Sequence, residues 1–113
     1  EHIDNPAVFL NKAKKLLKKG GYLMVACPNI DSLMARIFLD RWYGLQPREH
    51  RNQFTKKTLP NLLLSVGFNL EKVVVNNLDY QVKGWKGLIF TLLLKFADLA
   101  KMGDQIIVVA KYA

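Results

Sequence analysis

Apolar residues recur at helical spacing near the start of the chain. In the stretch PAVFLNKAKKLLKK, residues 6–19, the apolar positions that share one side of a helix are Phe9, Leu10, Ala13, Leu16 and Leu17. Lysines occupy the opposite side. Asn5 suits the N-cap and Pro6 the first helical position, and the glycine pair 20–21 follows the last turn. The pattern predicts an amphipathic helix over 6–19.

Three apolar runs of strand length lie farther along the chain. Residues 22–28, YLMVACP, are apolar without alternation, which predicts a strand buried on both faces, as in a parallel sheet. Pro28 ends this run. Residues 68–77, FNLEKVVVNN, and residues 104–112, DQIIVVAKY, predict two more strands.

Three further helices are predicted between and beside these strands. A short one follows Asp31 or Ser32, either of which could cap it, and its apolar stripe consists of Leu33, Met34, Ile37 and Phe38. In the helix of residues 55–67, a proline is tolerated only near the first turn, so Pro60 favours Thr58 over Thr55 as the N-cap. The helix of residues 85–102 is apolar over most of its circumference.

The resulting order is helix, strand, helix, helix, strand, helix, strand, with a loop over residues 41–54 that Gly44 and Pro47 mark. Alternation of strands and helices indicates an α/β layered fold. Three strands are few for such a fold. We therefore expect residues 1–113 to form one partial domain.

Charge and cysteine content add less than the pattern does. The formal net charge of +8 permits binding to nucleic acid, anionic lipid or an acidic ligand. Five of the seventeen basic residues lie on the first predicted helix, where a solvated face explains them, and no nucleic-acid-binding signature accompanies the charge. The single cysteine, Cys27, excludes an internal disulfide, fits a reducing cytoplasm, and lies in an apolar run where it is expected to be buried packing material.

Four segments, taken in order and spacing, resemble a known family. They are EH before the first helix, LLKKGGYLMVACPN, REHRNQFT and LLLSVGF. Together they resemble the C-terminal half of class I S-adenosylmethionine (SAM)-dependent methyltransferases. The branch is similar to the type 11/type 23 group, which includes quinone-biosynthesis and polysaccharide-pathway enzymes. Each segment is a weak signal alone, and none of them specifies a substrate.

The resemblance implies the C-terminal part of a Rossmann-like sheet of seven strands. Glu1-His2 would end the fourth strand, 22–28 would be the fifth, 68–76 the sixth, and 104–112 an antiparallel seventh between them. The SAM-binding half, with its glycine-rich loop, is then expected before Glu1. Gly20-Gly21 follows a helix rather than a strand, so it cannot cradle the cofactor as a strand-to-helix loop does. No cofactor-binding residue is expected within these residues, and the fragment alone is expected to be inactive.

Methyl transfer requires the acceptor to be held in line with the methyl donor, and a base can take the acceptor's proton. The segment 36–54 lies where the resemblance places an acceptor lid. Its aromatic and polar side chains are the predicted acceptor-binding residues, namely Arg36, Trp42, Tyr43, Arg48 and Gln53.

His50 has three interpretations. It is an ordinary loop histidine, or a base that positions and deprotonates the acceptor, since histidine titrates near neutral pH. The third is a metal ligand together with Glu1 and His2. That arrangement resembles the plant-type small-RNA 2′-O-methyltransferases and some quinone O-methyltransferases, in which a divalent ion lies beside the acceptor hydroxyl. Their pattern includes another glutamate upstream, which this chain lacks.

The helix of residues 85–102 contains LIFTLLL, but its lysines and Asp98 make it a poor membrane-spanning segment. One interpretation packs it on the sheet, with surplus apolar surface against the missing half of the domain or another subunit. The other places it in the plane of a membrane interface, with lysines toward headgroups, in an enzyme that acts on a lipid-linked acceptor.

The sequence thus predicts part of a cytoplasmic SAM-dependent methyltransferase that acts on a small-molecule or lipid- or sugar-linked acceptor. The alternative is a non-catalytic basic α/β module that binds anionic membrane or nucleic acid. Without a fourth strand beside it, the 22–28 strand would have a free edge, so the fragment is expected to self-associate.

Overall fold

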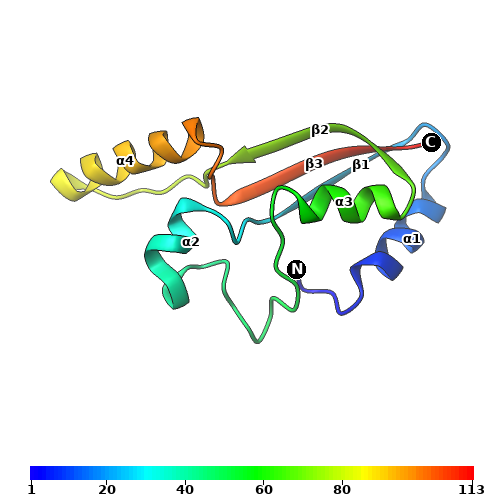
Figure 1. Ribbon diagram of the computed structural model, residues 1–113, viewed down its shortest axis with the longest axis horizontal. Helices are drawn as coiled ribbons and strands as arrows, with labels where there is room; N and C mark the ends of the chain where they lie inside the picture. The colour runs from blue at the N-terminus through cyan, green and yellow to red at the C-terminus, as the bar shows by residue number, and fades with distance from the viewer.

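A three-stranded sheet forms the centre of the fold, in a computed structural model that describes all residues 1–113 (Figure 1). The strands are β1 (Tyr22–Pro28), β2 (Phe68–Asn76) and β3 (Gln105–Tyr112), in the order β1-β3-β2. The central strand β3 is antiparallel to both neighbours, so β1 and β2 run in the same direction. This confirms the predicted antiparallel last strand between the two others.

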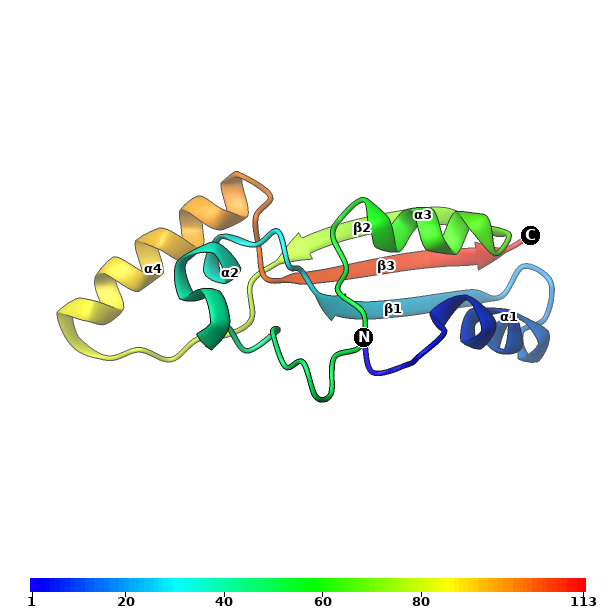
Figure 2. The same cartoon turned by 60° about the horizontal axis from the view of Figure 1, so that its bottom comes forward.

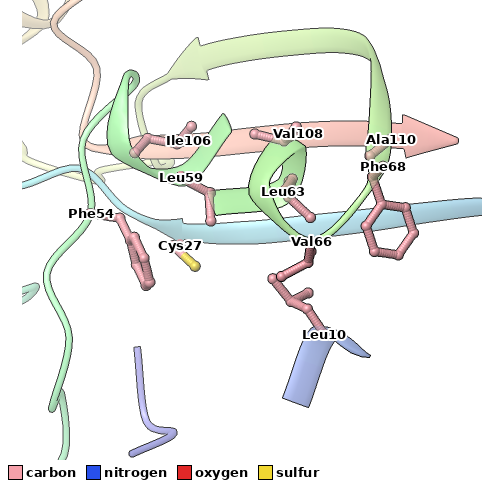
Figure 3. Packing of buried hydrophobic residues seen from close by; sticks show 10 residues of the cluster. All are labelled: Leu10, Cys27, Phe54, Leu59, Leu63, Val66, Phe68, Ile106, Val108 and Ala110. Carbon is pink, nitrogen blue, oxygen red and sulfur yellow. The ribbon is translucent and has the colours of Figure 1, made fainter. Parts of the chain in front are cut away.

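Helices α1 (Pro6–Leu16) and α3 (Thr58–Ser65) cover one face of this sheet (Figure 2). Figure 3 shows the core that they form with the strands, in which ten buried side chains meet. They are Leu10, Cys27, Phe54, Leu59, Leu63, Val66, Phe68, Ile106, Val108 and Ala110. Burial of this apolar surface is the main source of the fold's stability.

The other face of the sheet is uncovered, which corrects the prediction that β1 is buried on both faces. Tyr22 is 58% exposed and Met24 71% exposed, whereas Leu23 and Val25 pack against the core. Side chains alternate between the faces of a strand, and both helices lie on one side. The apolar run in β1 therefore has one face without a partner among these residues.

Helix α1 begins as predicted and ends earlier. The Asn5 side chain accepts a hydrogen bond from the Val8 amide at 3.1 Å, which confirms the N-cap. The helix ends at Leu16 instead of continuing to residue 19. Leu17 takes an extended conformation, with ψ 142°, and packs against the core, while Leu16 remains 88% exposed. Burial of Leu17 competes here with helix propagation.

The start of α3 corrects the predicted N-cap. Thr58 is the first helical residue, and the Thr55 hydroxyl accepts from the amides of Lys57 and Thr58 at 3.2 and 3.1 Å. Pro60 lies in the first turn, as predicted. Gly67 follows the helix with φ +86°, a conformation that strains any residue with a side chain.

A second helical group lies at one end of the sheet. Helix α2 (Leu33–Phe38), whose cap is Ser32, leads into the short 3₁₀ turn η1 (Leu39–Arg41). Helix α4 (Gly84–Leu99) is three residues shorter at its end than the predicted 85–102. It projects beyond the strands (Figures 1 and 2) and packs on α2 and Trp42 through Phe90, Leu93 and Leu94, not on the sheet.

Candidate active site

The first residues of the chain lie against the loop 41–54. The amides of Arg51 and Asn52 both donate to the Glu1 carbonyl, at 2.7 and 3.1 Å. Arg51 also pairs with the Asp4 carboxylate, and the Asn52 side chain donates to the Ile3 carbonyl. Residues about fifty positions apart in the chain are thereby held together.

This contact brings Glu1, His2 and His50 into one cluster. One potential ligand atom from each residue lies within 4.8 Å of those of the other two. The two imidazole centroids are 4.6 Å apart and the rings are nearly perpendicular. His2 Nε2 is 3.6 Å from a Glu1 carboxylate oxygen. His50 is buried, Glu1 is half-buried and His2 is exposed, so the cluster opens toward solvent on the His2 side.

Backbone carbonyls orient both histidines. His50 Nδ1 lies 2.8 Å from the Gly44 carbonyl, and His2 Nδ1 lies 3.1 Å from the Glu49 carbonyl. A carbonyl oxygen only accepts hydrogen bonds, so each Nδ1 carries the proton and donates. In the neutral rings, both Nε2 atoms then keep a lone pair. Each can accept a proton or bind a metal ion.

Gly44 contacts three other side chains of this loop. Its carbonyl accepts from Gln53 Nε2 at 3.2 Å in addition to His50. The Trp42 indole packs directly on Gly44, where a Cβ atom would lie 2.2 Å from the ring. Only glycine allows so close an approach. Gln53 and His50 therefore bind the same carbonyl oxygen, which places the Gln53 side chain next to His50.

Trp42 and Tyr43 lie deeper than an acceptor lid would require. Trp42 is 2% exposed and belongs to the second core, and its Nε1 has no hydrogen-bond partner. The Tyr43 hydroxyl donates to the Asp104 carbonyl at 3.2 Å. Burial raises the pKa of Tyr43 well above its ordinary range, and the negative charges of Asp104 and Glu1 raise it further. Tyr43 is therefore a neutral hydrogen-bond donor.

The two predicted arginines do not join the cluster. Arg36 is exposed on α2 and lines a shallow polar hollow with Asn29, Lys56 and Lys101. Arg48 is exposed beside Pro47, at the outer turn of the loop. The structure places neither side chain against His50.

Sequence reasoning missed the buried carboxylate of Asp104, just before β3. Its oxygens accept from the Leu78 amide, at 2.9 Å, and from the Tyr80 hydroxyl. Burial raises the pKa of Tyr80 above its usual range, and the hydrogen bond to Asp104 adds to this shift. A lone aspartate before an apolar run carries no signal of this role, because its partners approach only through the fold.

A groove of about 430 Å³ runs from Glu1 and His2 along the outer edge of β1. Most of its lining is apolar and includes Phe9, Leu62 and Met24. Cys27 also lines it, and burial raises the pKa of this thiol to about 11. A thiol that stays protonated is a poor nucleophile, in keeping with the predicted packing role.

Comparison with known proteins identifies the class. A family model described as a methyltransferase domain matches residues 1–73. The match spans α1, β1, the loop that carries His50, α3 and most of β2. The chain therefore belongs to this methyltransferase domain family.

Two solved structures share the fold. A SAM-dependent methyltransferase from Thermotoga maritima, described as a possible histamine N-methyltransferase, is 21% identical with a TM-score of 0.66 over 98% of this chain. A SAM-dependent methyltransferase from Archaeoglobus fulgidus is 20% identical with a TM-score of 0.59, also over 98% of this chain. The chain spans 50% and 54% of those two proteins, about half of their length. No curated protein matches the sequence.

Proposed function

We propose that these residues form the acceptor-side part of a SAM-dependent methyltransferase that transfers a methyl group to a small-molecule or lipid- or sugar-linked acceptor. The observation that carries the proposal is the family match over residues 1–73, joined to a β1-β3-β2 sheet that superposes on two such enzymes. It favours an enzyme over a non-catalytic basic module, which the net charge of +8 permits but which no family match supports.

The chemistry assigned to these residues is positioning and proton transfer. Ligands of open α/β sheets bind beyond the carboxyl ends of the parallel strands. Glu1 and His2 of the cluster line the groove beside β1 together with Cys27, close to the carboxyl end of that strand. With its proton held on Nδ1, His50 presents Nε2 to take the proton of the acceptor as the methyl group arrives. Gln53 keeps the shared Gly44 carbonyl in place.

The cofactor site is assigned to a further part of the domain. Gly20-Gly21 joins α1 to β1, so it is not a strand-to-helix loop. The groove along the free edge of β1 is apolar, and Tyr22 and Met24 are exposed on the uncovered sheet face. The two similar structures are about twice as long as this chain. We infer that the intact protein contains a counterpart of their additional segment, which pairs with β1 and covers the exposed sheet face.

A divalent metal ion is a second candidate feature of the same site, favoured by the Glu1, His2 and His50 geometry. Two imidazoles and one carboxylate suit a transition-metal ion and leave coordination positions open. The carbonyl bonds at both Nδ1 atoms are the outer contacts that metal-binding histidines use. When bound, such an ion would act as a Lewis acid toward an acceptor oxygen.

The decisive experiment uses the intact protein to which these residues belong. Calorimetry with SAM should show stoichiometric binding, and tritiated methyl-SAM incubated with a cell extract should label acceptors in the aqueous or the organic phase. The phase separates polar acceptors from lipid-linked ones. The isolated 113 residues should bind no SAM. Failure of the intact protein to bind SAM contradicts the enzymatic proposal, and micromolar binding by residues 1–113 alone contradicts the placement of the cofactor site.

A further inference from the structure

Helix α4 carries a continuous apolar stripe that nothing in the chain covers. The side chains of this stripe are Trp85, Leu88, Leu92, Phe96 and Leu99. Each is between 58% and 85% exposed. Their spacing of three or four residues places all five on one side of the helix. We call these five residues the α4 stripe.

The opposite side of α4 already has its packing partners. Ala97 is fully buried, and Phe90, Leu93 and Leu94 pack against the second core, which contains Trp42. The helix projects from the end of the molecule, with α2 on its inner side (Figures 1 and 2). Helix α4 therefore has two apolar sides. One packs against the second core, and the other, the α4 stripe, faces outward.

Lysines lie close to this stripe. At 100° per residue, Lys95 falls on one border of it, Lys86 lies in the first turn next to Trp85, and Lys83 and Lys101 lie just beyond the helix ends. Lys86 Nζ is 5.8 Å from the centroid of the Trp85 ring, so its charge lies beside the apolar surface. The one acidic residue of the helix, Asp98, accepts a hydrogen bond from the Asn77 side chain at 2.7 Å.

From this arrangement we infer that α4 docks the protein on an anionic lipid bilayer, lying in the plane of the interface. The α4 stripe would enter the boundary between headgroups and acyl chains, and the nearby lysines would pair with lipid phosphates. The net charge of +8 adds long-range attraction to an anionic surface.

The geometry favours a surface position over other uses. Sixteen residues make a helix of about 24 Å, less than the ~30 Å of a bilayer core. No helix in the structure has both the length and the apolarity needed to cross a membrane. A single projecting helix offers a convex face, which a fluid interface accommodates more readily than a rigid protein surface does, and the lysines beside the stripe and at the helix ends match anionic headgroups.

The test uses the intact protein and sedimentation with large unilamellar vesicles. Vesicles of equal phosphatidylglycerol and phosphatidylcholine should bind the protein, and pure phosphatidylcholine should bind it much less. Because Trp85 is 71% exposed and Trp42 is 2% exposed, a blue shift of tryptophan emission on binding reports on Trp85. A Trp85→Phe variant should abolish that shift while keeping an apolar side chain at this position.

Variants distinguish binding through the α4 stripe and its lysines from nonspecific adsorption to vesicles. The pair Leu88→Gln and Leu92→Gln should lower the partition coefficient about tenfold or more. Lys86→Gln with Lys95→Gln should weaken binding about tenfold on anionic vesicles only. The matched controls on α1, Leu16→Gln and Lys12→Gln with Lys15→Gln, should change binding little, because α1 lies far from this surface (Figure 1).

Two results would overturn the inference. One is a folded protein, by circular dichroism, that does not sediment with anionic vesicles. The other is vesicle binding that the Leu88 and Leu92 changes leave intact. A loss of dimerisation in that variant, without vesicle binding by the wild type, would assign the α4 stripe to a second copy instead. These readouts do not depend on SAM binding, so they stand apart from the test of the proposed function.

Discussion

The imidazole rings of His2 and His50 lie 4.6 Å apart and nearly perpendicular, and two backbone carbonyls hold their Nδ1 atoms. At the scale of single residues, the geometry of the candidate site therefore depends on the backbone carbonyls of Gly44 and Glu49 as much as on the histidine side chains. Glu1 adds the only carboxylate of the cluster. This arrangement yields separate predictions for turnover, for metal binding and for the neighbouring thiol.

Replacing His50 by alanine should affect turnover far more than stability. As the proposed base, its loss should lower kcat by about 100-fold or more. Gln53 still donates to the Gly44 carbonyl, so the loop keeps an anchor. Methyl transfer and thermal unfolding of the intact protein measure the two effects, with Glu49→Gln as a control in the same loop. Full activity in His50→Ala would make His50 an ordinary loop histidine.

Metal binding should require both histidines. Titration of the intact protein with Co²⁺ should produce visible absorption bands typical of imidazole coordination, and His2→Ala or His50→Ala should abolish them. Excess EDTA should remove the bands from the wild type, because the chelator competes with the protein ligands for the ion. Equal Co²⁺ spectra in the wild type and both variants would show that neither histidine is a ligand and would contradict this metal site.

Cys27 should make stability depend on alkaline pH. Its folded pKa of about 11 exceeds that of an unfolded thiol, about 8.5. Between these values the unfolded state has lost the proton and the folded state has kept it, so raising the pH favours unfolding. Urea unfolding at pH 7, 9 and 10.5 should show the wild type losing more stability than Cys27→Ala. A pH-independent difference between the two would contradict the buried, protonated thiol.

At the scale of elements, the short helix α3 depends on its cap and on one packed side. Leu59 and Leu63 are buried in the main core, and the Thr55 hydroxyl satisfies two free amides at the helix start. The pattern of apolar residues predicted this helix correctly. It did not identify the capping threonine, because the position of Pro60 favoured Thr58, whereas the Thr55 hydroxyl accepts the amide hydrogen bonds in the structure.

Thr55→Ala should therefore destabilise the protein by about 1 kcal/mol, the usual loss on removing a threonine cap. Denaturant unfolding of the intact protein measures this change. Asn61→Ala, at an exposed position within α3, is the control and should cost little. If the two substitutions prove equally mild, the Thr55 hydroxyl does not stabilise the helix start.

At the scale of the whole molecule, the dominant features are the surfaces left uncovered. The edge of β1 away from β3 has no strand beside it, and the groove there is apolar. Met24 on the sheet face and the α4 stripe add exposed apolar area. A free strand edge with no charge to blunt it is a template for pairing with another chain.

Residues 1–113 on their own should therefore form dimers or larger assemblies at low micromolar concentration. Sedimentation velocity measures this directly. Tyr22→Lys with Met24→Lys should reduce association by β1 pairing, whereas Leu88→Gln with Leu92→Gln tests the alternative route through α4. A stable monomer of 12.9 kDa would show that the chain itself protects these surfaces.

The sequence by itself determined the kind and order of the elements, because apolar periodicity and caps act over a few residues. Resemblance to methyltransferases added the antiparallel last strand, and it joined Glu1, His2 and His50 in one hypothesis. Long-range contacts decided the rest. Leu17 lies outside α1 and packs against the core, and one face of β1 is exposed because α1 and α3 both pack on the other face. Folding of the loop 41–54 brings the Gly44 carbonyl to His50. Pairing of β2 with β3 brings Tyr80 close to Asp104.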